Sequence, residues 1–221
     1  MPRSRLIVST ELPYHVTARA NNREIFPLSL DELWIHCGNV LWESQLLSGV
    51  RIHSFVLMPN HFHLILTSPD FSLGKVAQSI MANLTKSVNR ASGRSGHLFQ
   101  GPYHRTLIES SSYYGHALKY VLRNPVKAGL CERVEDWPYS SLQFTLGLRQ
   151  PLFRITESSS AIPSCTTSVH EDRALAWLNR AYRDESNAEK IREAFRKART
   201  NGLKDRRTRK SLEETLLREM E

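Results

Sequence analysis

Cysteine and long hydrophobic runs are both scarce in this chain. It has 3 cysteines among 221 residues, at positions 37, 131 and 165, and no two of them form a Cys-x-x-Cys pair. This spacing argues against a disulfide framework or a thiolate zinc site and fits a reducing compartment. No run approaches the roughly 18 apolar residues of a membrane span, and the apolar stretch near the N-terminus is too short for a signal sequence. We therefore expect a cytoplasmic protein with no membrane partner.

Negative charge is in the minority. Lys and Arg number 30 against 22 Asp and Glu, which gives a formal net charge of +8 at pH 7. A polyanionic partner fits this balance, although a charge count alone does not name it. The chain is 40% hydrophobic and 24% charged, which is typical of a soluble protein with one large core or two small ones.

The distribution of residue types predicts three parts. Eight of the nine histidines lie in residues 1–150, which we expect to form the catalytic domain. Residues 151–170 are rich in Ser, Thr and Pro and predict a linker. Residues 171–221 predict a basic helical C-terminal extension. Its basic run over 199–210 is typical either of a solvated helix face or of a patch that contacts phosphates.

Strand and helix periodicities alternate within the first part. The expected strands are 14–18, 51–58, 61–67 and 103–109, and the expected helices are 29–47, 72–90 and 112–124. Pro59 and Asn60 separate the second strand from the third, which predicts a tight antiparallel hairpin. The order β-α-β-β-α-β-α predicts an α+β fold of the ferredoxin-like sandwich type, with the helices on one face of an antiparallel sheet.

A His-x-His pair follows the predicted hairpin turn. Alternate residues of a strand point the same way, so His61 and His63 leave one face while Phe62 enters the core. Two neutral imidazoles side by side can hold one divalent ion. The pattern is short, and two histidines that are simply packed or on the surface produce it as well.

The helix expected over 112–124 carries a second group of candidates. Helical spacing places Asn124 one turn after Tyr120 and His116 one turn before it, in a polar stripe with Lys119 and Arg123. A phenol can attack a phosphorus centre and can leave again when the step is reversed. Asn124 could add an amide oxygen to a metal site, and His116 could assist proton removal. An aromatic residue packed at an interface is the alternative interpretation of Tyr120.

These motifs together resemble the single-tyrosine HUH transposases. The resemblance is carried by residues 58–65 (MPNHFHLI), 120–130 (YVLRNPVKAGL) and 137–141 (WPYSS). Residues 13–19 (PYHVTAR), followed by Asn-Asn-Arg at 21–23, narrow it to the REP-associated tyrosine transposases. The match covers roughly residues 10–145.

The resemblance implies the HUH transposase fold and a metal-dependent enzyme that cleaves and rejoins single-stranded DNA, with hairpin-forming repeats as its expected partner. By position, His61, His63 and Asn124 would hold a divalent metal, Mg²⁺ or Mn²⁺, and Tyr120 would be the nucleophile. Two imidazoles suit Mn²⁺ better than Mg²⁺, which prefers oxygen ligands. The tyrosine would become joined to the 5′ phosphate and release a 3′ hydroxyl. The family includes monomers and homodimers, and the sequence does not choose between them.

Substrate contacts follow from basic and aromatic residues in the same region. Tyr103 or Tyr113 could stack on an unpaired base. Ala20, Pro102 and His104 depart from the residues common in relatives, which puts target recognition in doubt. The candidates for contacts to the DNA backbone are Arg19, Arg23, Lys75, Lys86, Arg90, Arg105, Lys119 and Arg123.

Two other functions remain open at this stage. One is a domesticated protein that binds DNA or RNA without cutting it. The other is a metal-dependent phosphodiesterase that uses water as its nucleophile. A covalent adduct between protein and DNA separates the transposase from both.

Overall fold

A four-stranded antiparallel sheet forms the centre of the molecule. The computed structural model describes residues 9–68, 70, 72–156 and 168–182. The sheet has the order β2-β3-β1-β4, with β1 at Tyr14–Arg19, β2 at Arg51–Met58, β3 at His61–Thr67 and β4 at His104–Leu107. The main helices are α1 (Leu30–Ser48), α2 (Leu73–Ser92), α3 (Ser111–Leu122) and α6 (Ser168–Asn179), with short α4 (Asn124–Lys127) and α5 (Leu142–Thr145) between the last two. This order confirms the predicted α+β ferredoxin-like arrangement.

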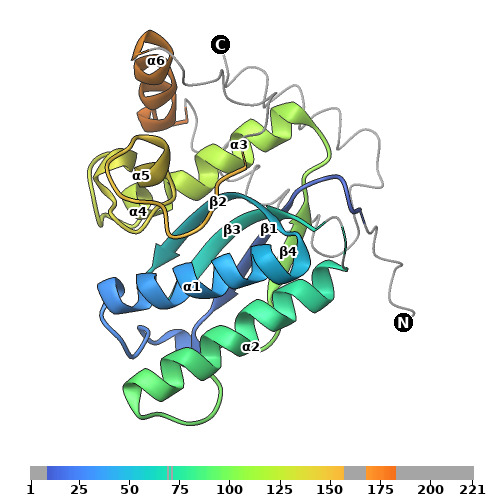
Figure 1. The fold of residues 1–221 in the computed structure, drawn as a ribbon. Coiled ribbons are helices and arrows are strands. Elements are labelled where there is room, and N and C mark those ends of the chain that lie inside the picture. Colours follow the sequence, from blue (N-terminus) through green and yellow to red (C-terminus); the bar gives the residue numbers. More distant parts are fainter. Residues whose placement is uncertain (1–8, 69, 71, 157–167, 183–221) are drawn as a thin grey trace, which may run out of the picture.

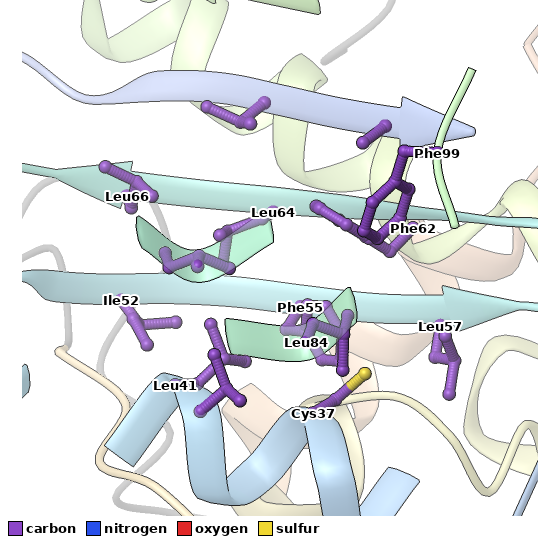
Figure 2. Close-up of a cluster of buried hydrophobic side chains, with 14 of the residues drawn as sticks. Cys37, Leu41, Ile52, Phe55, Leu57, Phe62, Leu64, Leu66, Leu84 and Phe99 are labelled. Atoms are coloured by element: carbon purple, nitrogen blue, oxygen red, sulfur yellow. The ribbon is translucent and has the colours of Figure 1, made fainter. Parts of the chain in front are cut away.

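Helices cover both faces of the sheet rather than one (Figure 1). Helices α1 and α2 pack on one face, and the larger core lies between them and side chains such as Phe55, Phe62 and Leu64 (Figure 2). Helix α3 packs on the other face against Val56 and Ile65. The prediction of helices on one face is therefore wrong for α3. Strands β2 and β3 are buried on both sides over most of their length, so both of their faces need a cover.

Local sequence signals fix where α1 and α3 begin. Ser29 and Glu32 form a capping box at the start of α1, and the helix ends at Gly49, whose φ of 59° is in the left-handed region. The side chain of Ser110 accepts a hydrogen bond from the Tyr113 backbone N–H and caps α3.

The turn between β2 and β3 is held by the segment that follows β1. The Ala20 N–H donates to the Asn60 carbonyl at 2.8 Å, and the Phe26 N–H donates to the Pro59 carbonyl at 2.8 Å. Met58 pairs with His61 across the turn. These bonds fix the backbone at the point where the His-x-His pair begins.

The chain that follows α3 is attached to the outer edge of β2. The Trp137 indole N–H donates to the Leu57 carbonyl at 2.9 Å, and the Leu57 N–H donates to the Tyr139 carbonyl at 2.9 Å. Trp137 and Tyr139 therefore anchor this part of the chain to the sheet.

The predicted linker, 151–170, begins with a packed segment. Phe153 is 2% exposed in the larger core, and the Thr156 N–H donates to the Ile52 carbonyl at 2.7 Å. Residues 157–167 lie outside the described residues. Helix α6 then packs on α3, where Leu178 is buried in the same cluster as Val121. The basic run over 199–210 lies outside the described residues. No helix in the described ranges is long and apolar enough to cross a membrane.

Candidate functional site

His61 and His63 project from the same side of β3, as the strand period predicted. We call this side, which also bears His15 of β1, the histidine face of the sheet. Phe62 points the other way into the larger core. The two imidazole centroids lie 5.0 Å apart, with their planes at 79°. His63 is 5% exposed and His61 is half-buried, so the pair opens to solvent at the turn end of the strand.

A third histidine belongs to this group. The ring of His15 stacks on His63 with centroids 5.1 Å apart, and His15 Nε2 lies 2.9 Å from His63 Nδ1. From the sequence alone, His15 is expected to be a structural residue. Its place in this group depends on the pairing of β1 with β3, and one strand does not reveal its register with a neighbouring strand. In the sheet, His15 pairs with Ile65 and Thr17 with His63, which puts both histidines on the histidine face.

Tyr120 of α3 lies over these rings. Its ring meets His63 edge to face at a centroid distance of 5.8 Å and His15 at 5.9 Å. The Tyr120 side chain is partly exposed. The fold therefore brings the candidate nucleophile and the two candidate metal ligands together, although Tyr120 follows His63 by 57 residues in the sequence.

His116 lies elsewhere. Its ring is fully buried, stacks on Tyr182 at 6.0 Å and meets Trp177 at 6.1 Å. Helix α6 and the residues just after it cover this side of α3, so the expectation that His116 assists Tyr120 is wrong. His15 is the additional imidazole in contact with the Tyr120 ring.

Burial keeps the histidines of the site neutral. It lowers the pKa of His15 to about 4. Burial, with a smaller contribution from the Arg19 charge, lowers the pKa of His61 to about 4. The pKa of His63 is well below its ordinary value because of burial and the neighbouring His15, His61 and Arg19. Neutral imidazole is the form that binds metal ions.

The two histidines fit part of a metal site. His63 Nε2 is buried and has no hydrogen-bond partner among the described residues, and His61 Nδ1 lies 2.7 Å from Asn60 Oδ1, so that contact does not engage His61 Nε2. Two imidazole nitrogens suit Mn²⁺ and other transition ions. Within the described ranges, no three side chains from His, Cys, Asp and Glu group closely enough to hold an ion. The pair would therefore need further ligands, such as phosphate oxygens and water.

Asn124 is turned toward the helix that precedes it. Its Nδ2 donates to the Tyr120 carbonyl at 2.7 Å and to the Val121 carbonyl at 3.4 Å. Among the residues that the structure describes, neither His61 nor His63 is a hydrogen-bond partner of this amide. The structure therefore does not bring Asn124 together with the histidines in the way that it brings Tyr120.

Two of the predicted DNA contacts lie beside the histidines. Arg19 pairs with His61 in the β1–β3 register and is exposed on the histidine face. Arg23 is exposed in the turn after β1, and its carbonyl accepts a hydrogen bond from Asn60 Nδ2 at 2.9 Å. His104 is also exposed on this face, opposite Thr17.

Lys119 and Arg123 are covered by α6, contrary to the prediction of an exposed polar stripe. Lys119 is 1% exposed, and its Nζ lies 4.6 Å from the Trp177 ring and 5.0 Å from the Tyr182 ring. Arg123 Nη1 donates to the Leu178 carbonyl at 3.0 Å and to the next carbonyl of the chain. These cations stabilise the packing of α6 on α3. Lys119 does not face solvent as a DNA contact would, whereas Arg123 is partly exposed.

The remaining candidates lie on the other side of the sheet. Lys75, Lys86 and Arg90 are exposed on α2, and the last two line a cavity of about 630 Å³ between α1 and α2. Arg105 pairs with Val16, whose side chain is in the larger core, and so shares that face. Tyr103 packs against the same core.

Tyr113 of α3 is buried, contrary to its candidacy as a base contact. Its side chain is 4% exposed in the core between α3 and the sheet, and burial raises the pKa of its phenol. It is not available to stack on an unpaired base.

Comparisons with known proteins agree with the motifs. No protein-family model matches the chain. It is 32% identical over 95 residues to the REP-associated tyrosine transposase of Escherichia coli, covering 41% of this chain and 53% of that protein. It is 29% identical over 96 residues to a putative REP-associated tyrosine transposase of Haemophilus influenzae, covering 38% and 54%. The alignments thus span about half the length of each curated relative.

A solved structure has the same fold. It is that of a REP-associated tyrosine transposase bound to a REP hairpin, with a TM-score of 0.55 and 22% sequence identity, covering 73% of this chain and 97% of that one. At this identity the likeness concerns the fold. Together with the two curated relatives, it confirms the resemblance that the motifs carry.

Proposed function

We propose that this chain is a REP-associated tyrosine transposase, which cleaves and rejoins single-stranded DNA at hairpin-forming repeats through a covalent link to Tyr120. The curated relatives are transposases of this kind, and the solved structure with the same fold is bound to a REP hairpin. One observation carries the proposal: Tyr120 packs directly on His63 and His15, on the face from which His61 also projects.

In the proposed reaction the Tyr120 phenol oxygen attacks the scissile phosphorus. A bond forms between that oxygen and the 5′ phosphate, the bond from phosphorus to the 3′ oxygen breaks, the phenol loses its proton, and the 3′ oxygen gains one. A later 3′ hydroxyl attacks the phosphotyrosine and releases Tyr120. The number of phosphoester bonds is unchanged at each step, so no external energy source is needed.

His61 and His63 would hold the divalent metal, Mg²⁺ or Mn²⁺. When bound, the cation supplies positive charge beside the scissile phosphate and offsets the negative charge of the transition state. The sheet fixes the two imidazoles and α3 fixes the phenol, so the reacting groups are held in place before DNA arrives. Asn124 Nδ2 donates to the Tyr120 carbonyl, so Oδ1 is the atom with which Asn124 would join the metal site.

Arg19 and Arg23 are the proposed contacts to the DNA backbone at the site. Both are exposed at the end of the histidine face that carries His61. Guanidinium groups bind phosphate oxygens with good geometry, and a strand that reaches His61 passes these side chains.

An adduct assay tests the proposal. A single-stranded repeat hairpin labelled at its 3′ end is incubated with protein and Mn²⁺, and the label is followed on a denaturing gel. We expect a labelled protein band that disappears with Tyr120→Phe and with EDTA. Tyr114→Phe is the matched control, because it makes the same chemical change on the same helix, where the ring contacts His53 instead of the site.

The other functions give different results in the same assay. Hairpin binding that survives Tyr120→Phe, with no adduct from the wild type, would favour a protein that binds without cutting. Cut DNA without a protein-linked product would favour a phosphodiesterase that uses water. Either result contradicts the proposed nucleophile.

A further inference from the structure

Both histidines of the His-x-His pair have a hydrogen-bond partner at the same ring nitrogen. His61 Nδ1 lies 2.7 Å from Asn60 Oδ1, and His63 Nδ1 lies 2.9 Å from His15 Nε2. The two partners come from different segments, the hairpin turn and β1. Neither partner was assigned a role in the chemistry by the sequence motifs.

The Asn60 amide has a defined orientation. Its Nδ2 donates to the Arg23 carbonyl at 2.9 Å, so its oxygen is the atom that faces His61. An amide oxygen only accepts hydrogen bonds, and His61 must therefore carry its proton on Nδ1. The Nε2 of His61 then has a free lone pair.

The contact between His15 and His63 is compatible with two placements of the proton, and the burial of His63 Nε2 distinguishes between them. If His15 donated to His63 Nδ1, neutral His63 would carry its proton on Nε2, where a buried N–H would have no partner among the described residues. A buried donor without a partner is costly. If His63 Nδ1–H donates to His15, the buried Nε2 carries only a lone pair and can accept a cation.

We propose that His15 and Asn60 are positioning residues that hold His63 and His61 in the same Nδ1–H tautomer, so that both Nε2 lone pairs face one divalent cation. Such partners of metal-binding histidines orient the ring and set the tautomer. The inference rests on the metal site of the proposed function and goes beyond it, since it assigns roles to two residues that the proposed reaction does not use.

Two measurements test the inference directly. Long-range ¹H–¹⁵N spectra of the metal-free wild type report the tautomer of each imidazole, and we expect the Nδ1–H form for both His61 and His63. Titration with Mn²⁺, followed by electron paramagnetic resonance, reports affinity without any requirement for activity. The first measurement needs no variant and is therefore independent of folding defects.

Variants of His15 then separate orientation from packing. We expect His15→Phe, which keeps a ring against His63 but removes the acceptor, to weaken Mn²⁺ binding by about 10-fold or more. His15→Gln keeps an acceptor oxygen and should restore part of the affinity. Asn60→Ala should weaken binding in the same way. His53→Phe is the control, because His53 is a half-buried histidine of the same sheet whose partners are Thr67 and Thr156.

A proton on His63 Nε2, or an unchanged Mn²⁺ affinity in both His15→Phe and Asn60→Ala, would overturn the inference. Wild-type protein that binds no Mn²⁺ would overturn it as well, together with the metal step of the proposed function. Failure of the transposase proposal alone has another signature: tautomers and affinities follow the expected pattern, but the wild type forms no adduct.

Discussion

Acid should destabilise this protein through His15, and replacing that residue should remove part of the effect. The His15 side chain is 6% exposed and its pKa is lowered by burial from 6.5 to about 4. The unfolded chain therefore binds a proton at higher pH than the folded protein does. The stabilisation by neutral His15 is complete above about pH 6.5 and is lost as the pH falls toward 4.

The size of the effect follows from the two pKa values. For one group that titrates at 6.5 when unfolded and at about 4 when folded, the free energy of unfolding falls by about 2 kcal/mol between roughly pH 8 and pH 5. His53, His61 and His63 also have lowered pKa values, but all three titrate in the variant as well. The difference between wild type and His15→Gln reports the contribution of residue 15 together with the part of the His63 shift that His15 causes.

Urea denaturation followed by circular dichroism measures this difference. Both proteins are unfolded with EDTA present, so that metal binding does not add to the proton linkage. We expect the wild type to lose about 2 kcal/mol more than His15→Gln over this pH range. Parallel stability curves for the two proteins would refute the reasoning, because they would mean that His15 is protonated in the folded state or exposed in it.

Three further changes test the packing that positions the site. Gly38→Ala should lower the free energy of unfolding by about 1–3 kcal/mol, because its Cβ would lie 2.6 Å from Leu152 Cδ1 and 2.7 Å from Leu152 Cβ, and the same change should cost less in thermal melts of a Leu152→Gly background, which removes both atoms. Trp137→Phe keeps a ring but loses the hydrogen bond to the Leu57 carbonyl, which should cost about 1 kcal/mol in urea titrations, and an unchanged midpoint would contradict the assigned bond. Leu178→Ala should weaken the packing of α6 on α3 by about 2–4 kcal/mol, and limited proteolysis should then cut faster within α6 while the sheet stays protected.

The parts of the fold that depend on local pattern were predictable. Helical spacing of the apolar residues over 72–90 marks an inward face, and its six members are the buried residues of α2: Leu73, Val76, Ala77, Ile80, Leu84 and Val88. Strands β2 and β3 have the expected bounds, because a Pro-Asn turn separates two runs with strong strand preference. Each of these signals lies within about 20 neighbouring residues.

The parts that depend on distant pairing were not predictable. Lys119 sits in a pattern typical of a solvated face, and only the arrival of Trp177 from α6 explains its burial. His15 joins the site because β1 pairs with β3 in a particular register, which a single strand does not reveal. The His-x-His pair and Tyr120 could be found from the sequence, since the resemblance linked motifs that periodicity alone left separate.

The cover that α6 places over α3 also changes what the basic composition of the chain means. Lys119 and Arg123 add to the count of 30 basic residues and lie in or beside the motif that carries Tyr120, yet Lys119 is buried against Trp177 and Arg123 donates to a carbonyl at the end of α6. Counterions on a nucleic acid are released only by cations that reach its phosphates. Lys and Arg residues in such a motif can therefore serve to pack one helix on another, and their charge is not by itself evidence of a ligand-binding surface.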